Sequence, residues 1–151
     1  MFTISRNGDA QAAQTVQFAT SDSGVGGAFA TAGTDYNALS GTLTFNQTDL
    51  SKTITVTTID DALFEQNEAF QVSLSNATGG ATIGTASATG TINNNALAGN
   101  DPAPIFNVSG ASLTEGGVMT FTVTRTGNAQ AAQTVAFGTS SGTAEIGRAH
   151  V

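Results

Sequence analysis

The chain of 151 residues carries 11 acidic and 4 basic residues, so its net charge is −7, and it contains no cysteine. Nucleic acid and anionic membrane surfaces repel such a chain, and we expect neither as a partner. Without cysteine the chain also lacks a disulfide framework, a thiolate zinc site and a cysteine nucleophile.

Apolar residues alternate with small polar residues along the first 95 positions, which is typical of strands with one buried face. Six strands between residues 2 and 93 predict an all-β fold, an antiparallel two-sheet sandwich. The apolar positions that mark the strands include, in chain order, Val16 and Phe18, Leu43 and Phe45, Ile54 and Val56, Phe70 with Val72 and Leu74, and Ala88 to Ile92. Turns are expected at Asn7-Gly8, Gly24 to Gly33, Gly41, Asn76 with Gly79-Gly80, and Asn93 to Asn95.

The sequence contains an internal repeat, which is a stronger signal of its organisation than the pattern of any single strand. The segment Phe2 to Ser21 reappears at Phe121 to Ser140, with 14 of the 20 positions identical. The second copy is preceded by Ile105 to Val118, which supplies a further strand that the first copy lacks. We therefore expect tandem repeats that are both truncated, because neither copy contains all the strands.

This alignment divides the chain into four parts. Residues 1–95 form a repeat without its first strand, 96–104 a linker, and 105–144 the N-terminal part of a second repeat. Residues 145–151 break the composition of the rest and look like a translated sequencing adapter, so we expect a non-native tail. A genuine loop is the alternative. If the tail is foreign, the only histidine, His150, is foreign with it.

Enzyme signatures are absent from the sequence. Without cysteine or a trustworthy histidine there is no nucleophile system, and no glycine-rich loop has the spacing of a phosphate site. Glu65 and Glu68 are conceivable as a glycosidase pair, but two carboxylates three residues apart seldom flank a cleft. No run approaches the roughly 18 apolar residues of a membrane helix, and any signal peptide lies outside this sequence.

One acidic loop stands out between the strands expected at Thr53 to Ile59 and Phe70 to Leu74. Four of the 11 acidic residues fall within nine positions there: Asp60, Asp61, Glu65 and Glu68. Hard oxygen ligands in a flexible loop are what Ca²⁺ prefers, although a solvated acidic loop has the same composition.

Three ordered segments resemble the Calx-beta domain. They are 30–45, with Gly33-Thr34-Asp35-Tyr36, then 59–70 with the acidic loop, and 88–95, which ends in three asparagines. The resemblance spans residues 2–95 and restarts near residue 105. It implies a seven-stranded Greek-key sandwich of immunoglobulin-like shape that binds Ca²⁺ at one end, as in sodium–calcium exchangers and long bacterial surface proteins.

The resemblance also implies a set of calcium ligands. The carboxylate ligands would be Asp35, Asp61, Glu65 and Glu68, with the adjacent Asp60 as a weaker candidate. Leu63 would contribute its backbone carbonyl, and Glu115 matches the first-strand glutamate of the family in the second repeat. Where the family commonly has aspartates, this chain has Asn93, Asn94 and Asn95, which offer neutral amide oxygens. Fewer charged ligands weaken calcium binding, so we expect one weakly held ion per site.

The sequence therefore predicts a non-catalytic calcium-binding repeat of a large secreted or cell-surface, adhesin-like bacterial protein. A bound ion is expected to stiffen the joint between repeats, where Asp101 is a further candidate ligand. The partners would be calcium ions and neighbouring repeats, with any cell-surface or glycan ligand bound by other domains. The alternative is a spacer repeat that has lost calcium binding through its asparagines.

Overall fold

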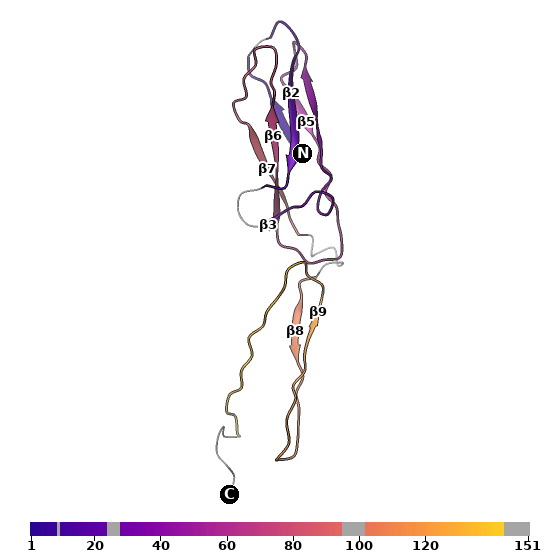
Figure 1. Cartoon of the computed structure of the whole chain (residues 1–151), viewed down its shortest axis with the longest axis vertical. Coiled ribbons are helices and arrows are strands. Elements are labelled where there is room, and N and C mark those ends of the chain that lie inside the picture. The colour runs from indigo at the N-terminus through magenta and orange to yellow at the C-terminus, as the bar shows by residue number, and fades with distance from the viewer. Residues whose placement is uncertain (9, 24–27, 95–101, 144–151) are drawn as a thin grey trace.

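The computed structural model describes residues 1–8, 10–23, 28–94 and 102–143. It is an elongated molecule in which the first repeat lies end to end with the second (Figure 1). Every regular element in these ranges is a β-strand. None of the described residues belongs to a helix long and apolar enough to span a membrane.

The first repeat is a sandwich of two sheets. The larger sheet has the order β3-β6-β2-β4, with β7 also paired to β6, and the smaller sheet pairs β1 with β5. The strands of the larger sheet are β2 (Gln14–Ser21), β3 (Ala28–Phe29), β4 (Ser40–Phe45), β6 (Glu68–Ser75) and β7 (Ser87–Ile92). Those of the smaller sheet are β1 (Phe2–Ser5) and β5 (Ser51–Ile54). The pairings are antiparallel except for β3 with β6, which is parallel.

Aromatic rings fill the space between the sheets. Tyr36 is fully buried, and its ring stacks on Phe70 at a centroid distance of 4.5 Å. Phe2 meets Phe70 edge to face at 5.8 Å. A side chain at Gly90 would lie 2.7 to 2.8 Å from the Phe70 and Phe2 rings, so this position of β7 requires glycine.

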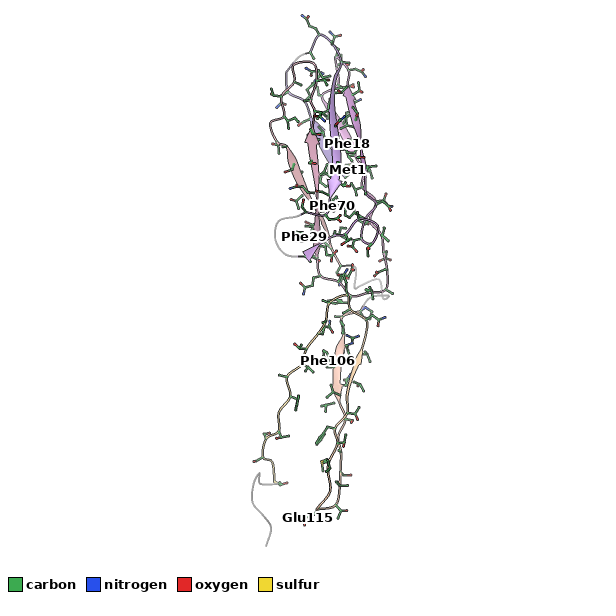
Figure 2. All side chains as sticks on the ribbon, viewed as in Figure 1. Met1, Phe18, Phe29, Phe70, Phe106 and Glu115 are labelled. Atoms are coloured by element: carbon green, nitrogen blue, oxygen red, sulfur yellow. The ribbon has the colours of Figure 1, made fainter. Side chains whose placement is uncertain are left out.

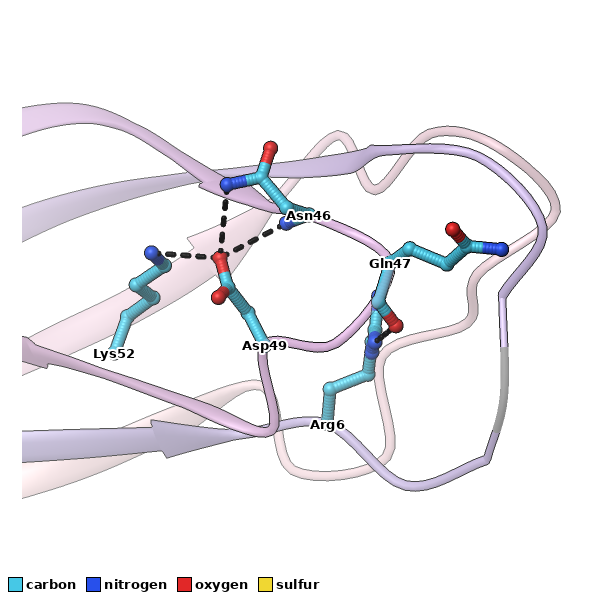
Figure 3. Close-up of polar contacts among 5 residues, drawn as sticks. All are labelled: Arg6, Asn46, Gln47, Asp49 and Lys52. Atoms are coloured by element: carbon cyan, nitrogen blue, oxygen red, sulfur yellow. Dashed lines mark hydrogen bonds and ion pairs between the residues drawn. The ribbon is translucent and has the colours of Figure 1, made fainter.

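The turn between β4 and β5 closes the end of the sandwich shown in Figure 3. Asp49 Oδ2 accepts hydrogen bonds from the Asn46 backbone N–H at 2.9 Å and from its side-chain amide at 3.2 Å. The same oxygen lies 2.8 Å from Lys52 Nζ, and the pKa of Asp49 is lowered by this contact and by the Asn46 N–H. An aspartate that binds back to the chain in this way favours a tight turn.

Two predicted elements differ from the structure. The strand expected over Thr53 to Ile59 ends at Ile54, and only an isolated bridge from Tyr36 to Thr58 continues the pairing. Val56 still packs against the core, which explains the alternating pattern without a strand. The glycine-rich stretch expected as a turn includes the short strand β3, because Ala28 and Phe29 pair with the start of β6.

The second repeat contains one hairpin among its described residues. β8 (Ile105–Val108) pairs antiparallel with β9 (Val123–Thr126). Val135, the counterpart of Val16 in β2, is 51% exposed, whereas Val16 is 8% exposed. Residues 127–143 form no strand and contain one isolated bridge, at Ala129.

Candidate metal centre

Three carboxylates converge at the end of the first repeat that faces the second repeat. Asp35, Glu65 and Glu68 each offer one oxygen, and these oxygens lie within 4.8 Å of one another. Asp35 comes from the loop between β3 and β4, Glu65 from the acidic loop, and Glu68 is the first residue of β6. Residues 33 positions apart in sequence therefore meet at one point.

The loop around Asp35 holds its side chain in place. The Thr31 backbone N–H donates to Asp35 Oδ2 at 2.6 Å, and the Asp35 N–H donates to the Thr31 carbonyl at 2.9 Å. The Ile59 N–H donates to the Asp35 carbonyl at 2.8 Å. This last bond fixes Asp35 against the beginning of the acidic loop.

Glu68 is buried because it follows the alternation of β6. It lies on the same face of the strand as Phe70 and Val72, which point into the core, and it is only 5% exposed. Burial, followed by the negative charge of Asp35 and a hydrogen bond to it, raises the pKa of Glu68 to about 7, and Glu65 adds to the shift. Glu68 Oε2 is buried and accepts no hydrogen bond.

A cavity of about 160 Å³ adjoins two of these carboxylates, Glu65 and Glu68. Asp60, Asp61, Leu63 and Asn94 all line it, together with Glu65 and Glu68. Asp61 Oδ1 accepts a hydrogen bond from the Leu63 N–H at 2.8 Å, which shapes the acidic loop into a turn. Asn94 Oδ1 is buried and has no hydrogen-bond partner.

The remaining predicted ligands are Asn95, Asp101 and Glu115. Asn95 and Asp101 fall outside the described residues. Glu115 lies at the far tip of the second repeat, away from the acidic loop of the first (Figure 2). It was assigned to a site of the second repeat, whose acidic loop the chain does not contain.

Two supporting residues were missed by sequence reasoning. Asn67 Oδ1 accepts the Asn94 N–H at 3.1 Å and so ties the last described residue after β7 to the acidic loop. Asp22 Oδ1 accepts the Tyr36 hydroxyl at 2.6 Å and the Ala32 N–H at 3.0 Å. Burial and then the bond to Asp22 raise the pKa of Tyr36 to about 12. Neither residue has a sequence signal of its own, since each acts through a contact distant in the chain.

The acidic loop also touches the second repeat. The Phe64 N–H donates to the Asn128 carbonyl at 3.1 Å, and the Gln130 N–H donates to the Phe64 carbonyl at 3.3 Å. These bonds form a parallel bridge between Phe64 and Ala129, which we call the Phe64 bridge. Phe64 directly precedes Glu65, so the bridge and the carboxylate cluster share one short segment.

The donor atoms in this region fit a hard divalent cation. Carboxylate, amide and carbonyl oxygens surround the cavity, without sulfur or imidazole, and this is the ligand set that Ca²⁺ prefers. The buried and unbonded Glu68 Oε2 and Asn94 Oδ1 are the atoms for which a cation would provide the missing partner.

Comparison with solved structures gives similar domains. The crystal structure of the apo form of the Calx CBD1 domain is 29% identical and covers 60% of this chain and 77% of that one, with a TM-score of 0.54. The calcium binding domain CBD12 of CALX1.1 is 26% identical and covers 72% of this chain and 42% of that one, with a TM-score of 0.57.

Comparison with characterised proteins gives a further relative. Adhesion G-protein coupled receptor V1 of Danio rerio is 34% identical over 102 residues, which is 67% of this chain and 2% of the receptor. This chain therefore spans a very small part of that relative. The Calx-beta domain profile matches residues 1–96 and 101–151. The all-β sandwich and these matches confirm the family predicted from sequence, and the chain belongs to the Calx-beta domain family.

Proposed function

We propose that the first repeat is a non-catalytic calcium-binding module of an adhesin-like protein. The observation that carries this proposal is the convergence of Asp35, Glu65 and Glu68 on one point, with the buried Glu68 Oε2 lacking a partner. The similarity to a calcium binding domain and to an adhesion receptor supports it. Burial of Glu68 also argues against a glycosidase role, because a sugar chain must reach both carboxylates.

The proposed ligands are oxygen atoms of the acidic loop and its neighbours. Asp35, Glu65 and Glu68 supply the charge, and Asp60, Asp61, the Leu63 carbonyl and the Asn94 amide line the adjoining cavity. The Asn95 amide completes the proposed set, and Glu115 would serve a complete second repeat. Neutral asparagines in place of aspartates favour one weakly bound ion, with a dissociation constant approaching about 10⁻³ M.

Weak binding suits an extracellular location. Extracellular modules bind calcium with dissociation constants of about 10⁻⁴ to 10⁻³ M, far weaker than cytosolic sensors. We therefore place the repeat in a secreted or cell-surface protein, with bacterial tandem-repeat proteins as the expected source. Ligands on other cells would be bound by other domains of that protein.

Calcium would act on the joint between repeats. Without an ion, the clustered carboxylates repel one another and loosen the acidic loop. A bound ion removes that repulsion and fixes Glu65, and thereby Phe64, whose main chain holds the second repeat through two hydrogen bonds. The ion would in this way convert a flexible joint into a stiff one.

Isothermal titration calorimetry of the full chain tests the binding. We expect one ion per first repeat with weak affinity, and Glu65→Gln should weaken it on the order of tenfold because a charged ligand is lost. Asp49→Asn, at the opposite end of the sandwich, is the matched control and should leave the affinity unchanged. No heat at about 10 mM calcium would contradict the proposal.

A calcium-independent spacer is the second candidate, and the Asn93 to Asn95 segment favours it. In that case the hydrogen bonds around Asp35 and Tyr36 hold this end of the sandwich without an ion. Thermal melting separates the candidates: a spacer melts at the same temperature with calcium and with a chelator, whereas a calcium module melts higher with calcium.

A further inference from the structure

The larger sheet of the first repeat ends in an exposed edge at β4. β4 pairs with β2 on one side, and no strand of the described residues pairs with its other side. The strand that this repeat lacks belongs beside β1 in the smaller sheet, just as β8 lies beside β9, so it would not cover β4. The open edge of β4 therefore does not depend on the missing strand.

The main-chain groups of three residues point out from this edge. The Thr20 N–H donates to the Leu39 carbonyl at 2.9 Å, so Leu39, directly before β4, directs its main-chain groups toward β2. This direction alternates along an antiparallel strand, so Ser40, Thr42 and Thr44 direct their N–H and carbonyl groups away from β2. All three residues are exposed, and no main-chain hydrogen bond from a described turn or loop reaches them. An edge of this kind is a template for another strand.

β4 lacks the features that normally keep a further strand away from a sheet edge, such as a lysine, a proline or a bulge. β5, an edge strand of the smaller sheet, carries Lys52, which is the only lysine of the chain. β4 pairs with β2 over six consecutive residues without a bulge, and residues 36–48 contain no charged residue and no proline. Because the chain has a net charge of −7, an uncharged edge is where two copies can approach each other with the least repulsion.

β4 is complementary to itself when the second strand is antiparallel and centred on Thr42. Thr42 then lies opposite Thr42 of the second copy, while Ser40 and Thr44 lie opposite each other on both sides of this centre. Each of these three pairs exchanges two main-chain hydrogen bonds, and hydroxyl side chains in such pairs also bind across strands. On the opposite face of the strand, Leu43 lies opposite Gly41, so the larger side chain meets a residue that has none.

We propose that β4 pairs with β4 of a second copy of this chain and joins the two larger sheets into one. A contact of this kind has two-fold symmetry, so it closes at a dimer. β2 lies along the long axis of the molecule and β4 is antiparallel to it, so the two copies lie side by side in opposite directions (Figure 1). In the adhesin-like protein proposed above, copies on two facing surfaces would have this orientation, and this consequence alone rests on the proposed function.

Sedimentation equilibrium of the full chain tests the dimer. We expect a monomer–dimer equilibrium that is the same with calcium and with a chelator, because β4 contains no proposed calcium ligand. Thr42→Lys should weaken dimerisation at least about tenfold, because two lysines then lie directly opposite each other at the edge. Ser75→Lys is the matched control, since it adds the same charge to the same face on β6, two strands away from the edge. It should change the dissociation constant less than about threefold.

Both variants should melt at the temperature of the unchanged chain in dilute solution, because both side chains are exposed. A chain that stays monomeric up to about 1 mM, or equal effects of the two lysines on dimerisation, would overturn the proposal. A dimer that forms only with calcium would also overturn it, because the copies would then meet at the carboxylates.

The distance between the two copies tests the register. The chain has no cysteine, so Ser75→Cys provides a single position for a spin label. Ser75, Gln17 and Thr42 lie in one row across the sheet. Pairing at Thr42 therefore puts five strand spacings between the two labelled residues, or about 24 Å between their Cα atoms. A distance that differs from this by more than the label arms can span would show that the copies meet elsewhere and would overturn the pairing of β4.

Discussion

The Phe64 N–H donates to the carbonyl of Asn128 at 3.1 Å, across the junction between the two repeats. Because both bonds of the Phe64 bridge are main-chain bonds, side-chain identity at Gln130 should matter little. We expect Gln130→Pro, which removes the N–H that binds Phe64, to loosen the joint. The distribution of distances measured between spin labels on the two repeats should become broader.

Gln130→Ala is the control for this prediction, since it keeps the N–H and should leave the distance distribution unchanged. The melting temperature of the first repeat should be the same in both variants, because its sheets do not involve residue 130. A broadened distribution in the alanine variant would mean that the side chain, not the bridge, holds the joint.

Glu68 makes calcium-free stability depend on pH. Its pKa rises from 4.5 to about 7 on folding, so the folded chain holds a proton that the unfolded chain releases. Stability without calcium should therefore fall as pH rises from about 4.5 to about 7 and remain low above that range. Urea denaturation between pH 4 and pH 8 with a chelator measures this slope, and Glu68→Gln should reduce it.

Calcium should bind more weakly as the pH falls below about 7, since protons compete for Glu68. Calorimetric titrations at pH 6 and pH 8 compare calcium binding to the chain with Glu68 protonated and with Glu68 ionised. A calcium affinity that is the same at both pH values would mean that Glu68 is not a ligand.

Tyr36 is the only tyrosine in a chain without tryptophan, so its ultraviolet absorbance reports on one residue. Tyrosinate formation should have its midpoint near pH 12 in the folded chain, against 10.0 in denaturant. The neutral form is favoured by folding, so the stabilisation is complete below pH 10 and is lost as the pH rises toward 12.

Tyr36→Phe removes the hydroxyl that donates to Asp22. We expect a loss of about 0.5 to 1.5 kcal/mol of stability, because one hydrogen bond is lost while the ring still stacks on Phe70. Chemical denaturation measures it. An unchanged free energy of unfolding would show that water replaces the bond without cost.

Gly90→Ala should destabilise the first repeat by about 1 to 3 kcal/mol, because the added methyl meets the buried Phe70 ring and the partly buried Phe2 ring at under 3 Å. Gly84→Ala is the matched control, since no heavy atom lies within 4 Å of a side chain there. Melting curves of the two variants give the comparison, and similar shifts would contradict the packing argument.

The alternation of apolar and polar residues predicted most strands of the fold. It could not predict contacts between residues that lie far apart in the chain. Alternation at Phe70, Val72 and Leu74 marked β6, and that same alternation explains the burial of Glu68. The end of β5 was predicted too late in the chain, because Val56 still packs against the core after the strand pairing has stopped. Alternation shows which side chains are buried, but it does not show which main-chain groups of distant segments lie beside them.

The candidate site shows the same division. Family resemblance named Asp35, Glu65 and Glu68, which the structure brings within 4.8 Å of one another. It did not reveal the bond between Asn67 and Asn94 or the Phe64 bridge, because backbone contacts leave no residue signature.

The Phe64 bridge also bears on how the chain responds to force. The two repeats lie end to end, so a pull that separates them acts along the long axis (Figure 1). Between the described residues of the two repeats, the two main-chain hydrogen bonds of the Phe64 bridge cross the junction, whereas β2 alone pairs with β4 over six residues and with β6 over five. We therefore expect the junction to yield first under such a force, so that the molecule lengthens by opening at its joint while the β2 pairings stay intact.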